Sequence, residues 1–257
     1  MFGAIAGGVI GSVYEHRPIK TTDFPLYHRD SRFTDDTVLT VAIAAAILNK
    51  TDYGASLQVF GRKYPDAGYG GAFLQWLSDP QSRPYNSWGN GAAMRVSPVG
   101  FAFADAETVL AEAKKTADVS HNHPEGIKGA QATALAVFLA RTGAGKETIR
   151  NQIRERFGYN LDRTVDDIRP GYRFDVSCQG SVLEAIIAFL DSDSYEDAIR
   201  NAISLGGDSD TLACIAGGMA QAFYKHIPPE IVTKVTKRLP REFLGIIDRF
   251  DSNYLDT

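Results

Sequence analysis

The sequence contains little cysteine. Cys178 and Cys214 are the two cysteines among 257 residues, and Cys214 lies in an apolar stretch with a helical period. A disulfide framework of the kind that supports small secreted proteins needs more thiols, so buried reduced cysteines are the favoured interpretation. This usage is typical of a reducing compartment, and we expect a cytoplasmic protein.

The chain also lacks an excess of basic residues. Lys and Arg number 27 against 31 Asp and Glu, which gives a net charge of −4. No basic footprint for nucleic acid or an anionic membrane is therefore present, and we expect neither as a partner. The apolar start, residues 1–12, has no positively charged signal-peptide region and is too short to span a membrane. Its glycines predict a closely packed helix, because no strand precedes them as a dinucleotide fingerprint requires.

Alternating patterns typical of β-strands are missing as well, and so are repeats and low-complexity tracts. The hydrophobic fraction of 44% is ample for a core, and we predict an all-α fold in which residues 1–257 form a single compact multi-helix domain. Residues 17–32 and 162–179 are expected to be irregular. Helices are expected over Val38–Leu48, Ala55–Arg62, Phe73–Leu77, Ala106–Ala117, Glu125–Arg141, Lys146–Phe157, Leu183–Leu190, Tyr195–Leu205, Leu212–Phe223 and Pro229–Arg249.

The most informative stretch is the polar start of one apolar helix. Asp208, Ser209, Asp210 and Thr211 follow Gly206-Gly207 and precede a helical apolar face that begins at Leu212. One of these side chains would suffice as an N-cap, and taken by itself the motif favours that role. Two carboxylates this close repel each other, however, unless a cation or protons lie between them. Oxygen ligands on a short spacing are those that Mg²⁺ or Mn²⁺ prefers.

A second motif of the same kind lies near the other end of the chain. Thr34, Asp35, Asp36 and Thr37 precede the apolar run 38–48, again with two hydroxyls and two carboxylates where one cap would do. If the two helix starts meet, four Asp and several hydroxyl oxygens converge. That set is sufficient for a pair of metal ions that polarise oxygens during hydrolysis. A shared site also requires both ends of the chain, which favours one domain.

Further candidate residues lie in polar loops. Residues 68–71, with Gly68, Gly70 and Gly71, suit close backbone approach to a ligand, although a simple turn fits equally well. The loop 86–95 carries Trp88, which is either a core residue or a platform for a nucleotide. His121 and His123 favour hydrogen bonding or substrate contact over metal ligation, because the other candidate ligands are all oxygens. Glu15, taken alone, is typical of a solvated surface residue.

These motifs together resemble the ADP-ribosylglycohydrolase family. The residues that carry the resemblance are Phe33-Thr34-Asp35-Asp36-Thr37, Asn86-Ser87-Trp88-Gly89-Asn90-Gly91-Ala92-Ala93-Met94-Arg95, Ser120-His121-Asn122-His123-Pro124 and Gly206-Gly207-Asp208-Ser209-Asp210-Thr211. They occur in the family's order and spacing over nearly the whole chain. The resemblance implies an all-α fold with a central dinuclear site for two Mg²⁺ or Mn²⁺ ions next to the scissile bond of an ADP-ribose group.

The resemblance also implies roles for individual residues. It assigns metal ligation to Thr34, Asp35, Asp36, Asp208, Asp210 and Thr211, and substrate binding to Gly68, Gly70, Gly71, Asn86, Ser87, Trp88, Gly89 and His121. Glu15 matches a mobile acidic residue that approaches the metals and the substrate. Glu15, Asp36 and Asp210 are the candidate catalytic carboxylates, and the sequence does not choose the general base among them.

The expected activity is hydrolysis at the ribose anomeric carbon, which releases ADP-ribose from a modified protein or a small-molecule conjugate. The arginine linkage is favoured over a serine or other oxygen linkage, and a monomer is expected. A phosphatase of the D-x-D-x-[TV] type fails, because Asp208 follows a helix rather than a strand and Leu212 replaces Thr or Val. A calcium loop lacks its central Gly and closing Glu. A silent ADP-ribose-binding relative is the remaining alternative, although inactive members typically lose acidic ligands that this chain keeps.

Overall fold

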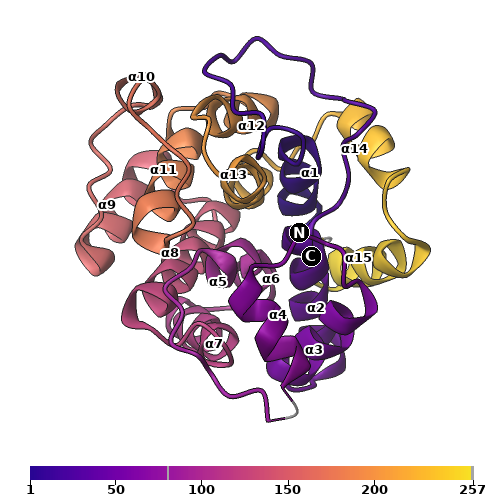
Figure 1. The fold of residues 1–257 in the computed structure, drawn as a ribbon. Coiled ribbons are helices and arrows are strands. Elements are labelled where there is room, and N and C mark those ends of the chain that lie inside the picture. Colours follow the sequence, from indigo (N-terminus) through magenta and orange to yellow (C-terminus); the bar gives the residue numbers. More distant parts are fainter. Residues whose placement is uncertain (80, 256–257) are drawn as a thin grey trace.

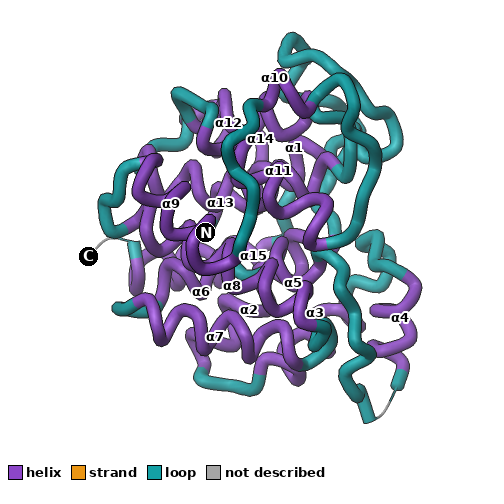
Figure 2. The backbone as a smooth tube through the Cα atoms, turned by 90° about the vertical axis from the view of Figure 1, so that its left-hand side faces the viewer, coloured by secondary structure: helices purple, strands orange, loops and turns teal. Residues whose placement is uncertain are grey.

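Helices carry nearly all of the regular structure of the chain (Figures 1 and 2). The computed structural model describes residues 1–79 and 81–255, and within these ranges it contains no strand; one isolated antiparallel bridge pairs Gly89 with Ser177. The all-α prediction is confirmed. The helices are α1 (Phe2–Gly11), α2 (Asp35–Asn49), α3 (Tyr53–Lys63), α4 (Gly71–Ser78), α5 (Gly91–Met94), α6 (Ser97–Ala102), α7 (Ala106–Asp118), α8 (Pro124–Arg141), α9 (Lys146–Phe157), α10 (Val165–Ile168), α11 (Cys178–Leu190), α12 (Tyr195–Ser204), α13 (Ser209–Tyr224), α14 (Pro229–Thr236) and α15 (Arg241–Tyr254).

Helices α1 and α13 pack in the core with their backbones in contact. Every residue of α1 is buried, and the glycines along it let the two backbones touch. A Cβ atom on Gly7 would lie 2.0 Å from the carbonyl oxygen of Ala213, and one on Gly11 would lie 2.4 Å from that of Ser209. No side chain fits at these positions, so glycine is required by the close approach. The end of α1 is thereby fixed against the start of α13.

Helix α2 joins this pair at the same end. A Cβ atom on Gly8 of α1 would meet Cβ of Asp36 at 3.5 Å and Cβ of Cys214 at 3.8 Å. Helix α2 is buried from Asp36 to Ala46, as expected for a helix that is apolar on every side. The end of α1 and the starts of α2 and α13 therefore meet, and the two polar motifs of the sequence come together there.

The predicted helix Pro229–Arg249 is wrong, because two helices occupy this range. Helix α14 ends at Thr236, and Pro240 with extended backbone (ψ 147°) precedes α15. Proline has no N–H to donate and restricts the residue before it, so a helix cannot continue smoothly through this point. In the turn between them, Arg238 donates hydrogen bonds to the carbonyl oxygens of His28 (3.0 Å) and Ser31 (3.1 Å).

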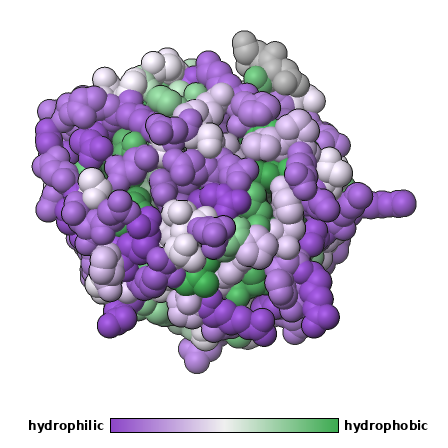
Figure 3. All heavy atoms as spheres, turned by 90° about the horizontal axis from the view of Figure 1, so that it is seen from above, coloured by the Kyte–Doolittle hydropathy of each residue, from purple (hydrophilic) through white to green (hydrophobic). Residues whose placement is uncertain are grey.

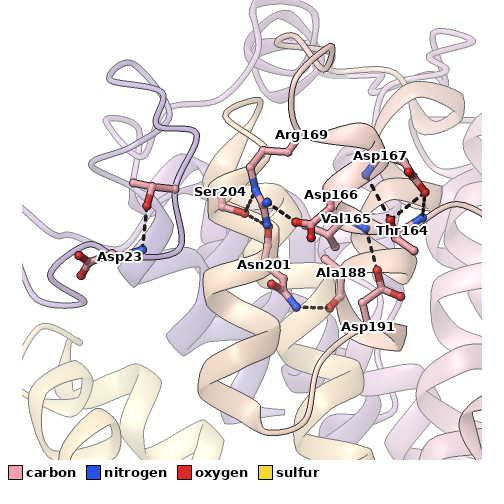
Figure 4. Close-up of polar contacts among 11 residues, drawn as sticks. Asp23, Thr164, Val165, Asp166, Asp167, Arg169, Ala188, Asp191, Asn201 and Ser204 are labelled. Carbon is pink, nitrogen blue, oxygen red and sulfur yellow. Dashed lines mark hydrogen bonds and ion pairs between the residues drawn. The ribbon is translucent and has the colours of Figure 1, made fainter.

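Three short helices, α5, α6 and α10, were not predicted. Helix α10 lies in the range 162–179 that was expected to be irregular, and a capping box formed by Thr164 and Asp167 begins it. Figure 4 shows this segment held to its neighbours. Val165 N–H donates to Asp191 Oδ2 at 2.7 Å, and Arg169 Nε donates to Ser204 Oγ at 2.9 Å. The loop around α10 is therefore fixed on α11 and α12.

The segment between α1 and α2 is a long loop, as predicted for residues 17–32 (Figure 1). Hydrogen bonds from basic side chains fix this loop to distant parts of the chain. Arg200 of α12 donates to the carbonyl oxygens of Thr22 (2.9 Å) and Phe24 (2.8 Å). Lys20 Nζ donates to the carbonyl oxygen of Tyr172 at 2.7 Å and also to that of Leu205. This loop therefore keeps a defined course beside the start of α13.

The face of the molecule that Figure 3 shows is mainly hydrophilic. Figure 3, seen from above, shows hydrophobic residues as small separate areas among polar ones. Of the helices in the described part of the chain, none is both long enough and apolar enough to cross a bilayer.

Candidate active site

A cluster of carboxylates lies where the three helix ends meet. Oxygen atoms of Glu15, Asp208 and Asp210 all lie within 4.8 Å of one another. Asp35 and Asp36, at the start of α2, interact electrostatically with Asp210 in the same place. The structure therefore brings together the acidic residues of both motifs, from opposite ends of the chain.

The residues at the N-cap positions of α2 and α13 do not serve as ordinary helix caps. Thr34 and Asp208 occupy the N-cap positions of α2 and α13, but neither side chain accepts a capping hydrogen bond. Other helices of the same chain do have such bonds, from Asp52, Asp105, Thr164, Ser177 and Ser194. The plain N-cap interpretation of both motifs is therefore wrong, and the excess of oxygen atoms needs another explanation.

Two carboxylate oxygens of the cluster are buried without a partner. Oδ1 of Asp36 and Oδ1 of Asp210 make no hydrogen bond to the described residues. The other oxygen of Asp36 accepts one from the Thr34 hydroxyl at 3.2 Å. Buried polar atoms are nearly always satisfied in folded proteins, so these two oxygens indicate a ligand that the protein atoms do not supply.

Electrostatics supports the same conclusion. Burial raises the pKa of Asp36 and of Asp208 well above the ordinary aspartate range, and repulsion by Asp210 raises both further. The pKa of Asp35 is raised in the same way, first by burial and then by Asp210 and Asp208. Carboxylates in such a place are stabilised by a cation or by protons. A donor set made of carboxylate and hydroxyl oxygens fits a hard divalent ion.

Glu15 belongs to the cluster, so its interpretation as a solvated surface residue is wrong. Its side chain is 23% exposed, and burial together with repulsion by Asp210 raises its pKa. It follows α1 in a turn, where Tyr14 N–H donates to the carbonyl oxygen of Gly11 at 2.8 Å. Glu15 therefore connects the buried carboxylates with the surface.

The glycine loop 68–71 borders the cluster on the side of α2. Gly68 has φ +102°, a conformation that favours glycine, and a Cβ there would lie 3.8 Å from Oδ1 of Asp35. The N–H of Asp35 donates to the carbonyl oxygen of Ala67 at 2.8 Å, which fixes the loop to the start of α2. A Cβ on Gly70 or Gly71 would meet no atom within 4 Å. These two glycines therefore face open space.

The loop 86–91 places Trp88 at the surface. Its side chain is 54% exposed, so the alternative of a core tryptophan is wrong. Trp88 packs edge-on against His123, with ring centroids 6.0 Å apart. Asn86 N–H donates to Asn122 Oδ1 at 2.8 Å, and Ser87 Oγ accepts from Gly89 N–H at 3.1 Å. The loop is thus held in shape while its aromatic ring stays accessible.

The two histidines have different surroundings. His123 caps α8 by accepting a hydrogen bond from Glu125 N–H at 3.1 Å. His121 is buried, and its Nδ1 lies 2.8 Å from the Ser120 hydroxyl. In the described part of the chain, the group of close carboxylate, thiol or imidazole ligands is Glu15, Asp208 and Asp210, without either histidine.

Asn90 belongs to the site, although no sequence motif predicted a role for it. Its Nδ2 atom donates to Asp208 Oδ2 at 2.8 Å and to Ser181 Oγ at 3.2 Å. This bond favours the charged form of Asp208 and connects the loop 86–91 to the acidic cluster. The sequence contained one signal for such a role: Asn90 carries a side-chain amide and lies between two glycines, Gly89 and Gly91.

Comparison with known proteins agrees with this geometry. The ADP-ribosylglycohydrolase family profile matches residues 1–254. ADP-ribosylhydrolase ARH3 of Mus musculus is 26% identical, over 86% of this chain and 82% of its own length. ADP-ribosylarginine hydrolase Tri1 of Pseudomonas putida (strain GB-1) is 30% identical over 57% of this chain and 42% of its own.

The chain is similar to a further enzyme and to a solved structure. The ADP-ribosyl-[dinitrogen reductase] glycohydrolase of Rhodospirillum rubrum is 27% identical over 62% of this chain and 55% of its own. A solved structure, titled ADP-ribosylglycohydrolase-related protein complex, has the same fold, with a TM-score of 0.73 and 22% identity over 98% of this chain and 96% of its own. The chain belongs to the ADP-ribosylglycohydrolase family of glycosidic-bond hydrolases.

Proposed function

We propose that this protein is a divalent-metal-dependent hydrolase that removes ADP-ribose from modified proteins or small-molecule conjugates by cleaving the bond at the ribose anomeric carbon. The observation that carries the proposal is the cluster of carboxylates at unused cap positions, with unpartnered buried oxygens on Asp36 and Asp210. The names of the relatives support the reaction class. Because the cluster draws on both ends of the chain, we also propose that residues 1–257 act as one domain.

The residues that would hold two Mg²⁺ or Mn²⁺ ions are those of the two motifs: Thr34, Asp35, Asp36, Asp208, Asp210 and Thr211. When bound, divalent ions orient substrate hydroxyls and lower the pKa of a coordinated water. Asn90 holds Asp208 through its amide, and Thr34 holds Asp36 through its hydroxyl. These hydrogen bonds fix carboxylate orientation, a role that is usually required for tight metal binding.

The chain offers three carboxylates for the proton transfer: Glu15, Asp36 and Asp210. Cleavage at an anomeric carbon passes through an oxocarbenium-like transition state, which a nearby carboxylate stabilises while a second group activates water. Asp36 and Asp210 are almost fully buried, at 1% and 4% exposure, whereas Glu15 is partly exposed. A general base must contact both water and substrate, so the geometry favours Glu15 for that role and the two aspartates for charge stabilisation.

For the linkage, we propose ADP-ribosylarginine, with a serine or other oxygen linkage as the alternative. An arginine leaving group is a cation and fits a site with acidic residues at its edge. Glu15 lies there, and Asp23 and Asp30 are exposed in the adjacent loop. Basic residues of this loop would oppose a cation. Lys20 is engaged with the carbonyl oxygens of Tyr172 and Leu205. Arg29 pairs with Asp30 at 3.5 Å, and Arg17 is exposed. The similarity to a protein named ADP-ribosylarginine hydrolase supports this choice.

The deciding experiment measures release of ADP-ribose from arginine-modified and serine-modified peptides side by side, with Mg²⁺ or with excess EDTA. We expect turnover of the arginine peptide that is lost in EDTA and in Glu15→Gln, and retained in Glu155→Gln, a matched change on the exposed face of α9. A preference for the serine peptide by a factor of about 10, or about 1.4 kcal/mol, would overturn the linkage. ADP-ribose binding without turnover of either peptide would identify a silent relative.

A further inference from the structure

Arg95 is a buried cation for which the described residues provide no anion. Its side chain is fully buried at the end of α5, and Nη2 donates to the carbonyl oxygen of Thr116 at 2.7 Å and to Ser120 Oγ at 2.9 Å. Among the described residues, Nε and Nη1 have no hydrogen-bond partner, and no carboxylate pairs with Arg95. Burial lowers its pKa to about 10, so Arg95 stays charged at neutral pH. A charge without a counter-ion is costly to bury, which indicates a role beyond packing.

The hydroxyl of Ser120 links Arg95 to His121. Ser120 is fully buried, and its Oγ atom contacts two groups, Arg95 Nη2 and, at 2.8 Å, His121 Nδ1. A guanidinium can only donate hydrogen bonds, so Oγ accepts from Arg95. The hydroxyl proton needs an acceptor of its own, and His121 Nδ1 is the one within reach. With Nδ1 as acceptor, the proton of the neutral imidazole resides on Nε2.

The surroundings of His121 keep the ring neutral. Burial lowers its pKa well below the ordinary histidine value, and the charge on Arg95 lowers it further. The ring packs against Tyr85 (centroids 5.6 Å apart) and Phe73 (6.5 Å), so Arg95 and Tyr85 are the ionisable groups that face it. Neither supplies a negative charge at neutral pH that would stabilise an imidazolium.

Nε2 of His121 faces the glycines of the loop 86–91. A Cβ on Gly91 would lie 2.9 Å from Nε2, and one on Gly89 would lie 3.6 Å away. The Cβ atom of a Gly91→Ala variant would therefore clash with this nitrogen, whereas Gly91 leaves space beside it. Nε2 has no hydrogen-bond partner among the described residues. His121 is 6% exposed, so the residue is not completely enclosed by protein atoms. The N–H is thus available next to Ser87 and Trp88, the residues to which the family resemblance assigns substrate binding.

We propose that Arg95 and Ser120 are positioning residues that hold His121 as a neutral Nε2–H donor for an anionic oxygen, the diphosphate of ADP-ribose. The unneutralised guanidinium favours an anion at this place, and the fixed N–H gives that anion a directed hydrogen bond. The identity of the ligand rests on the proposed function. The tautomer does not, because the protein atoms alone determine it.

The test is nitrogen-15 NMR of the full chain labelled at histidine, at pH 7 and without ligand, with the His121→Gln variant to assign the signals. We expect a protonated Nε2 and an unprotonated Nδ1 on His121. A protonated Nδ1, or an imidazolium, overturns the proposal whether or not ADP-ribose binds. This measurement needs no variant of Arg95, whose side chain is fully buried in the core.

A second measurement tests the role in binding. Ser120→Ala removes the hydroxyl, and we expect it to shift the tautomer equilibrium and to weaken ADP-ribose binding about threefold to tenfold, the effect of one misdirected hydrogen bond. Ser120→Thr, which keeps the hydroxyl, should restore both properties. Ser56→Ala is the matched control, since Ser56 is also buried and donates to a carbonyl oxygen, that of Ala42. Equal affinity of Ser120→Ala and the unmodified protein overturns the positioning role. Failure of the unmodified protein to bind ADP-ribose overturns the proposed function, while the imidazole signals still decide the tautomer.

Discussion

Replacing Asp210 by Asn should change stability in opposite directions with and without metal. Oxygen atoms of Asp210, Glu15 and Asp208 lie within 4.8 Å of one another, and Oδ1 of Asp210 has no hydrogen-bond partner among the residues that the structure describes. At that separation, two unit charges repel by about 3.5 kcal/mol for an effective dielectric constant of about 20. Proton uptake relieves part of this repulsion, so we expect the metal-free protein to gain about 1–2 kcal/mol from Asp210→Asn. The amide also finds acceptors in the adjacent carboxylates.

Divalent metal should reverse the order. A ligand at about 100 times its dissociation constant stabilises the folded state by about 2.7 kcal/mol, provided that the unfolded chain does not bind it. The variant loses a ligand and most of that gain. For a chain of this size, about 1 kcal/mol corresponds to about 2–4 °C in melting temperature. The variant should therefore melt about 2–8 °C above the unmodified protein in EDTA, and below it in saturating Mg²⁺.

Thermal unfolding in EDTA and over a Mg²⁺ or Mn²⁺ titration measures both effects. Glu155→Gln is the control, because it removes one exposed carboxylate from α9 and should leave the curves unchanged under either condition. If Asp210→Asn melts lower in EDTA as well, the carboxylate is a structural hydrogen-bond acceptor and the repulsion argument is refuted. A flat metal titration of the unmodified protein would refute the metal site itself.

Three further outcomes follow from particular contacts. Gly7→Ala should lower the free energy of unfolding in urea by about 3 kcal/mol, because the new Cβ would lie 2.0 Å from a backbone oxygen. Gly8→Ala makes ordinary contacts from 3.5 Å and should cost less than about 1 kcal/mol. Equal losses would contradict the packing of α1 on α13. Trp88→Ala should leave the melting temperature nearly unchanged and weaken ADP-ribose binding by about tenfold, and Trp88→Phe should have an intermediate affinity. If calorimetry gives Trp88→Ala the same affinity as the unmodified protein, Trp88 does not belong to the site. Asn90→Ala should lower Mg²⁺ affinity by about 10-fold to 100-fold in calorimetry, and unchanged affinity would show that Asp208 needs no support from the loop.

Sequence patterns predicted the helices where an apolar period was long and uninterrupted. The failure at Pro229–Arg249 has a specific cause, because the period continues through the break. Buried apolar side chains recur at Ile231, Val235, Leu239, Phe243 and Ile247, four residues apart, on both sides of Pro240. Both helices use the same spacing to pack on the core, so periodicity alone does not reveal the turn between them. The proline was the available signal. Helices α5, α6 and α10 are too short to show any period.

The acidic site could be predicted in part because it violates a local rule. A helix start needs one capping side chain, and an excess of carboxylates at two starts is visible without a structure. Glu15 has no such signal, since a single acidic residue after a helix is usually solvated. Its role near the metal ions was inferred only from the family resemblance. Asn90 and the contacts of Arg95 with Ser120 were not predicted. Their partners lie 25 to 118 residues away in the chain, and no local pattern records such contacts.

The close packing of α1 on α13 explains how the fold tolerates this site. The backbones of α1 and α13 touch at Gly7 and Gly11, and no side chain lies between them there. Because this packing is tight, the helix ends cannot move apart to relieve the repulsion between the carboxylates. The apolar core on the far sides of these helices supplies the stability that the cluster reduces. A metal ion then stabilises an arrangement that already exists, rather than creating it, and this is why the metal-free protein should remain folded while Asp210→Asn makes it more stable.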